Sequence, residues 1–317
     1  MNIDHDDANP ALTEGPAQKK LKDNVEWRIT FDQTQGVRTL IDVVGGILQR
    51  INLRVKYDER RKVHFLCIDS IDPSHICMIQ ARLLCEKTHN LTEDVSFCVE
   101  EKIFNLIMKH IPNHYSVDFE KRRDSADIHV RGYETLSNSH QTHFEMRTLV
   151  DDGEIMHLND IEYKHQIEMD LSLLRQIVKM SKSLNSEQLE FIVKKPKNDE
   201  NERILRTVFT IASRGDAVQS HKFYSATVAE NPRDKEGPCI IRAATDSTGP
   251  ECEDEADMAV VYSDAFANEY LSNFLKNMER QIITMKLSQD KPLIVHYPLG
   301  ADKSYICFVL APKTADD

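Results

Sequence analysis

Lysine and arginine recur at helical spacing in segments that lie far apart in this 317-residue chain. Arg175, Lys179 and Lys182 stand at i, i+4 and i+7, opposite a stripe of leucine, isoleucine and valine. Such a row puts cationic groups on one helix face, where they can contact phosphates without reading a base sequence. The polar residues expected on these outward faces are Arg38, Lys102, Asn105, Lys109, Arg175, Lys179, Lys182, Lys276 and Arg280.

Four amphipathic segments carry these residues, and strand-like sequence follows each of them. The segments are 36–51, 100–111, 170–181 and 264–278. Their starts are 64, 70 and 94 residues apart, and removing an acidic insertion of about 27 residues brings the last interval to about 67. The sequence therefore predicts one helix-plus-strands unit used four times. In the second helix we expect Ile103, Phe104, Ile107 and Met108 to face the core.

A basic helix face is ordinarily just a solvated face, and for one helix alone that interpretation is favoured. Three copies with the same spacing favour a shared function. If the four helices lie side by side, their outward faces form one continuous basic surface.

The net charge of the whole chain is negative, in contrast to these basic helix faces. Forty Lys and Arg stand against 52 Asp and Glu, for a net charge of −12. This balance argues against nonspecific coating of nucleic acid by the entire surface. The segment 230–257 alone holds nine acids and three bases, which is half of the net charge. A local basic surface is compatible with the remainder.

The pattern predicts an α+β fold with two similar domains, each with two helices packed on antiparallel β-sheet. We expect a disordered polar tail at 1–24, an N-terminal domain at 25–143 and a connector at 144–163. A C-terminal domain at 164–317 would carry an exposed acidic insertion at about 230–257. No apolar run approaches the roughly 20 residues that span a bilayer, so we expect no membrane partner.

Enzyme motifs are absent from the sequence. There is no phosphate-binding G-x-x-x-x-G-K-[ST], no H-E-x-x-H and no Gly-rich dinucleotide loop. His110 and His114 straddle Pro112, while His140 and His143 fall in polar linker sequence. We therefore expect no catalytic residue, no metal site and no cofactor. The seven cysteines form no C-x-x-C pair, which favours reduced thiols.

Four short motifs carry a family resemblance. The loop 71–76 (Ile-Asp-Pro-Ser-His-Ile) resembles the early loop of the eukaryotic-type DNA sliding clamp, proliferating cell nuclear antigen. The stretch from 144–147 through 161–163 is similar to the interdomain connector of that clamp. The segments 292–297 and 310–313 resemble its last two strands and tail. The resemblance covers about 27–313, excluding the insertion.

This resemblance implies a homotrimeric ring that encircles duplex DNA without sequence preference, with the helices lining the hole. It also implies a clamp loader and a function as processivity factor in DNA replication and repair. Polymerases and other proteins with clamp-binding peptides would be partners. The expected location is the nucleus or a viral replication site in a host cell.

The resemblance further implies a hydrophobic pocket for partner peptides beneath the connector. Asn159 stands where the family usually has proline. Lys194 lies near the strand end where the family carries a lysine modified by ubiquitin-like proteins, although adjacent exposed lysines are common. For Ile71, Ile76 and Met156 the alternative is ordinary core packing. The pocket residues implied are Ile71, His75, Ile76, Met156, Leu158, Pro292, Ala311 and Pro312.

Two other functions stay open at this point. One is a subunit of a heterotrimeric checkpoint clamp, which would form a ring only with two different chains. The other is a monomeric β-rich scaffold that binds peptides and never encircles DNA. The mass of the lone protein in solution separates the first from the homotrimer.

Overall fold

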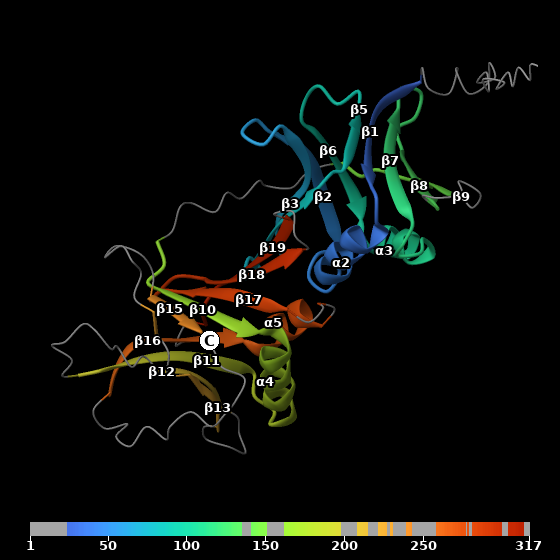
Figure 1. Cartoon of the computed structure of the whole chain (residues 1–317). Coiled ribbons are helices and arrows are strands. Elements are labelled where there is room, and N and C mark those ends of the chain that lie inside the picture. The colour runs from blue at the N-terminus through green and yellow to red at the C-terminus, as the bar shows by residue number, and fades with distance from the viewer. Residues whose placement is uncertain are drawn as a thin grey trace, which may run out of the picture.

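The computed structural model describes most of the chain (Figure 1). The described residues are 24–134, 141–150, 162–197, 208–214, 221–226, 229–230, 239–242, 258–276, 278, 281–299 and 304–313. The predicted tail lies almost entirely outside these ranges, as does most of the predicted connector.

Two helices and nine strands make up the first half of the chain. They are β1 (Val25–Phe31), α2 (Thr34–Val44), β2 (Arg50–Asp58), β3 (Val63–Ile71), β4 (Cys77–Leu84), β5 (Lys87–His89), β6 (Val95–Glu100), α3 (Glu101–His110), β7 (Ser116–Arg122), β8 (Ile128–Tyr133) and β9 (Gln141–Met146).

The second half repeats this arrangement. Its described elements are β10 (His165–Asp170), α4 (Leu171–Ser183), β11 (Gln188–Pro196), β12 (Val208–Arg214), β13 (His221–Ala226), β14 (Ala229–Glu230), β15 (Cys239–Arg242), β16 (Met258–Ala267), α5 (Asn268–Leu275), β17 (Ile282–Leu287), β18 (Leu293–Leu299) and β19 (Ser304–Leu310).

These strands form three sheets. The first has the order β5-β1-β7-β8-β9, and the second the order β13-β12-β11-β16. The third has ten strands in the order β14-β15-β10-β17-β18-β19-β4-β3-β2-β6 and contains strands from both halves. The halves are joined where β19 pairs antiparallel with β4, from Tyr305 opposite Arg82 to Leu310 opposite Cys77. The predicted fold class, α+β with helices on antiparallel sheets, is confirmed.

The helices pack on the sheets through aromatic side chains of the core. Phe104 of α3 meets Phe119 of β7 edge to face, and Phe274 of α5 stacks on Phe308 of β19. The strands alternate as expected for sheets with one face against a core, as in β10, where Ile167 is fully buried. The alternation along β10 therefore agrees with its burial.

Two helix boundaries differ from the prediction. α2 ends at Val44, because a glycine pair follows and residues from Arg50 onward join a sheet as β2. α5 begins at Asn268 instead of 264, because residues before it extend β16, where Phe266 pairs with Leu189. Both errors arise where apolar residues suit a helix and a buried strand equally well.

Two predicted connecting segments also contain strands. Residues 144–146 belong to β9, which pairs with β8 at the edge of the five-stranded sheet, so the connector cannot begin at 144. Within the acidic insertion, β15 pairs in parallel with β10, and Ile241 is fully buried. The insertion is therefore not wholly an exposed loop. Its acidic composition concealed one short strand.

Within the described residues, no helix combines the length and the apolar character needed to cross a bilayer. Five buried cysteines of the described part are in no disulfide, and they are Cys67, Cys77, Cys85, Cys98 and Cys307.

Candidate nucleic-acid interface

The four described helices follow one another along one side of the molecule (Figure 1). α2 contacts both α3 and α5, and α5 in turn contacts α4. The spatial order is therefore α3, α2, α5, α4, although the order in the chain is different. The outward faces of four separate segments thus become neighbours.

Gly45, directly after α2, lies tightly against α3, whereas a side chain at Gly46 would make only an ordinary contact with α5. A Cβ added at Gly45 would stand 2.2 Å from Oε1 of Glu101, the first residue of α3. A Cβ at Gly46 would come within 3.4 Å of Asn273 in α5. Because Gly45 has no side chain, the Glu101 carboxylate can lie against the end of α2.

The helices carry a different charge balance from the rest of the chain. Together α2, α3, α4 and α5 contain six Lys and Arg but three Asp and Glu. The whole chain has 52 acids and 40 bases. The helices of this acidic protein thus carry an excess of base, which favours an anionic partner there.

Five of the predicted lysines are exposed on this side, and none forms an ion pair with another described residue. Such ammonium groups can exchange water for phosphate oxygens without breaking a protein contact. These lysines, called the helix-face lysines below, are Lys102, Lys109, Lys179, Lys182 and Lys276.

Three other predicted residues need separate description. Arg38 is half-buried and donates from Nη1 to Oδ1 of Asn113 at 2.8 Å. Asn105 donates to Oε1 of Glu101 at 3.0 Å. Both side chains thus make contacts within the protein, whereas Arg280 lies outside the described residues.

Arg175 does not project outward as predicted. Its Nε donates to the carbonyl oxygen of Leu275 at 3.0 Å, and Nη2 donates to the carbonyl oxygen of Met278. These carbonyls lie at the end of α5, where helix carbonyls lack intrahelical partners. Arg175 therefore fastens α4 to α5 and is a structural cation, which corrects its assignment as DNA-facing.

The outward faces also carry apolar side chains. Ile103, predicted to face the core, is 44% exposed, and Leu106 of the same helix is 54% exposed. Met180 on α4 is 43% exposed. The helical side is therefore a mixed surface with isolated lysines between apolar side chains, in place of a purely basic stripe.

A second candidate site lies on the opposite face of the ten-stranded sheet. Alternate residues of β19 face away from α5, since Phe308 points toward that helix. A small apolar cluster, separate from the main core, covers this outer face with Ile71 and Tyr305 packed against it. Its buried members, called the outer cluster below, are Met78, Tyr163, Ile294, Cys307 and Val309.

Predicted pocket residues border this outer cluster. Ile71 packs against it, and the hydroxyl of Tyr163 donates to the carbonyl oxygen of Pro292 at 3.0 Å. The backbone nitrogen of Ala311 donates to the carbonyl oxygen of Ile76 at 2.9 Å. The structure thus brings together the loop 71–76, the start of β18 and the chain after β19. Pro312 is half-buried, whereas Met156, Leu158 and Asn159 lie outside the described residues.

The loop 71–76 is held in shape by Asp72. Its buried carboxylate accepts hydrogen bonds from the backbone nitrogens of Ser74, Ile76 and Cys77, at 3.1, 2.8 and 2.6 Å. The hydroxyl of Tyr270 in α5 also donates to it, at 2.8 Å. The loop thereby projects His75 and Ile76, both exposed, beside the outer cluster.

Sequence reasoning missed the buried centre of this surface, since it named only residues carried by the resemblance. Alternation along β4, β18 and β19 could have identified Met78, Ile294 and Val309 as one face.

Lys194, the residue compared with a modified lysine of the clamp family, is half-buried in β11, between β12 and β16.

Solved structures with similar folds include two clamps. Over 90% of this chain and 100% of the other, the structure resembles PCNA from Thermococcus kodakaraensis with a TM-score of 0.67 and 14% identity. Over 92% of this chain and 100% of the other, it resembles the proliferating cellular nuclear antigen from Entamoeba histolytica, with a TM-score of 0.65 and 12% identity. No protein-family model matches the sequence, and no curated protein matches it. The chain therefore has the fold of these clamps, with very little of their sequence.

Proposed function

We propose that this clamp-fold chain is a DNA sliding clamp that encircles duplex DNA as a homotrimer and tethers polymerases and repair proteins. The observation that carries the proposal is the contiguous row of four helices with excess base on an acidic protein. This function requires no catalytic residue. It would be performed in the nucleus or at a viral replication site.

Ring closure is supported by the way in which the two halves are joined. Within the chain, β19 pairs with β4, the fourth strand of the first half. β9 is the last strand of the first half, as β19 is of the second, and β13 is the fourth strand of the second half, as β4 is of the first. Among the described strands, β9 and β13 each stand at the edge of a sheet. An edge strand presents unpaired backbone groups to another chain. We infer that β9 of one copy pairs with β13 of the next, so that one joint is used within and between subunits.

DNA would be retained by topology more than by affinity. The helix-face lysines are few, and exposed apolar side chains separate them. Individually weak phosphate contacts let a closed ring slide along the duplex. Partner peptides would bind beside the outer cluster, next to the loop that Asp72 shapes.

The test is the mass of the purified chain in solution, followed by its retention on DNA. A homotrimer has three times 36.5 kDa and, after loading, stays on closed circular DNA but leaves the same DNA when it is linearised. A stable monomer that leaves both forms equally fast would contradict the proposal. A monomer that enters a ring only with two other chains would indicate the heterotrimeric clamp instead.

A further inference from the structure

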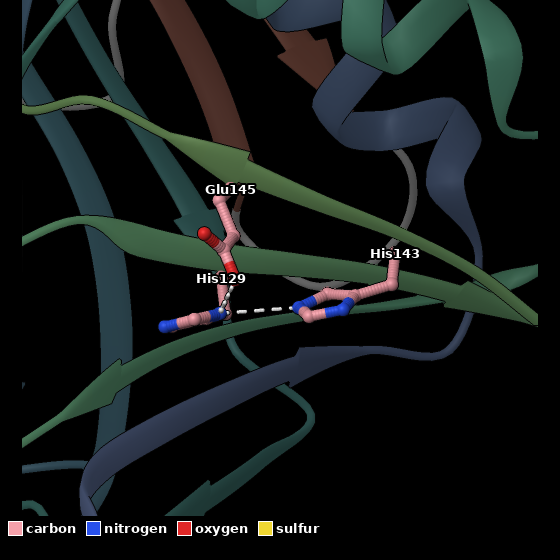
Figure 2. Close-up of side chains that lie close together, drawn as sticks. All are labelled: His129, His143 and Glu145. Carbon is pink, nitrogen blue, oxygen red and sulfur yellow. Dashed lines mark hydrogen bonds and ion pairs between the residues drawn. The ribbon is translucent and has the colours of Figure 1, made fainter. Parts of the chain in front are cut away.

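Three potential metal ligands meet on the outer face of the five-stranded sheet. His129 lies on β8, and His143 and Glu145 lie on β9 (Figure 2). The antiparallel register places His129 directly opposite Glu145, and His143 opposite Arg131, two pairs along the ladder. All three side chains therefore project from the same face, and Figure 2 shows them converging.

Their separations match those of ligands around one small cation. His129 Nδ1 lies 3.1 Å from His143 Nε2 and 3.7 Å from Glu145 Oε1. Two ligands bound tetrahedrally to zinc, each about 2.0–2.1 Å from it, stand about 3.3 Å apart. Glu145 is 62% exposed on its side chain, so its carboxylate can shift toward an ion without disturbing the core.

Charged groups of the same sheet surround the imidazole of His129, among them Arg122 and Glu120. Arg122 and Arg131 bind the Glu120 carboxylate at 2.8 and 2.5 Å, so their charges are balanced within the sheet.

His129 is poorly compensated without an ion. It is 3% exposed, and its Nε2 has no hydrogen-bond partner among the described residues. Among the described residues, its Nδ1 has one hydrogen-bond partner, His143, because the 3.7 Å to Glu145 is too long for a hydrogen bond. A cation at Nδ1 would give this nitrogen a stronger partner than the single contact to His143, with the proton then on Nε2.

We propose that His129 Nδ1, His143 Nε2 and Glu145 Oε1 bind one zinc-class divalent ion, with water at the fourth position. Two imidazoles and a carboxylate suit zinc, cobalt and nickel, whereas magnesium and calcium prefer oxygen ligands alone. The ion links β8 to the edge strand β9. The proposal departs from the expectation that the chain has no metal site, because sheet pairing brings together histidines 14 residues apart.

The test titrates cobalt into the full, chelator-treated chain. Visible absorption typical of tetrahedral cobalt should develop to one equivalent per chain, and zinc, but not magnesium, should abolish it. His143→Gln and Glu145→Gln alter exposed side chains and should each weaken binding at least about tenfold. His89→Gln, an exposed histidine of β5 in the same sheet, should bind like the parent protein.

Thermal unfolding supplies an independent measurement. Zinc should raise the Tm of the parent chain and of His89→Gln, because an ion that binds only the folded state stabilises it. It should leave the Tm of His143→Gln almost unchanged. Equal zinc affinity in all variants, or no zinc binding by the parent chain, would overturn the proposal. The contact between His129 and His143 would then be only a hydrogen bond between two imidazoles. These measurements do not depend on ring formation, so the site can stand or fall apart from the proposed function.

Discussion

The helical side of the molecule and the outer face of the five-stranded sheet both carry cations, but in opposite circumstances. The helix-face lysines are exposed and have no ion pair with a described residue. On the outer sheet face, Arg28, Arg122 and Arg131 surround Glu120, with contacts of 2.6, 2.8 and 2.5 Å. The first set is available to an external anion, whereas the second holds the protein together.

The helix-face lysines and the sheet arginines differ because carboxylates lie next to the arginines across the sheet but not next to the lysines along the helix. Lys179 has Arg175 and Ser183 at i−4 and i+4, so α4 provides no acidic partner for it. In the sheet, the register sets Glu120 opposite Arg28 on one side and His129 on the other. A cation is therefore free or paired according to its neighbours across the fold, not according to its residue type.

The largest expected effect on stability comes from removing the carboxylate at the centre of the paired set. Glu120 is 1% exposed, and Glu120→Gln would leave three guanidinium groups without their shared charge. We expect the free energy of unfolding to fall by about 2–3 kcal/mol, because the arginines retain some solvent. Denaturant titration measures this, with the exposed Glu93→Gln as the control that changes little. Equal stability of both variants would show that the sheet does not depend on the paired set.

A smaller effect is expected from Arg175, the helix residue that behaves like the sheet arginines. Arg175→Ala removes hydrogen bonds to the carbonyls of Leu275 and Met278. The expected decrease in the free energy of unfolding is about 1.5 kcal/mol, since those carbonyls then lie unpaired at a helix end. The same denaturant titration on Lys179→Ala, one turn along α4, should show almost no decrease. If the two variants unfold alike, Arg175 belongs with the free cations after all.

The paired set should also respond to acid. Burial raises the pKa of Glu120, but the hydrogen bond from Arg122 and the charges of Arg131 and Arg28 outweigh it, and the pKa lies below 4.5. A carboxyl whose pKa is lowered by folding contributes stability above its unfolded pKa and loses it as the pH falls through the folded pKa. The stability gap between the parent chain and Glu120→Gln should thus be full at about pH 6 and shrink below about pH 4.5. Unfolding at several pH values measures it, and a constant gap would contradict this charge assignment.

The smallest effect on stability is expected from the helix-face lysines, where the effect on DNA should dominate. Lys179→Ala combined with Lys182→Ala should change the free energy of unfolding by less than about 0.5 kcal/mol for each substitution. The salt dependence of DNA binding should become shallower by about 0.9 for each phosphate that the variant no longer neutralises. Lys164→Ala, at the end of β10 away from α4, is the matched control. An unchanged salt slope in the double variant would favour a scaffold that never encloses DNA.

Much of the architecture was predictable because its signals are local. Apolar residues at helical spacing identified four helices, and strand-like sequence was recognised after each of them. Boundaries failed where apolar residues suit both states, as at Phe266. β9 and β15 were missed because their sequences are polar or lie within acidic sequence, and only pairing with β8 and β10 makes them strands.

The candidate sites were predictable only in part. Exposure of the five helix-face lysines agrees with their spacing, but Arg175 shares that spacing and instead contacts carbonyls about 100 residues away. Ile103 was expected in the core but is exposed, because an isoleucine at the edge of the apolar stripe fits the helical period in either position. The histidine pair gave no signal because His129 and His143 meet across a hairpin.

Helical periodicity, strand alternation and short motifs suffice to specify the four helices, the fold class and a basic helical side. Each of these signals depends on residues a few positions apart. Which cation is free, which edge strand is open and which imidazoles converge depend on contacts between residues distant in the chain. Those contacts are set by sheet register and helix packing, whose energies come from the whole core. They exist only once the chain has folded.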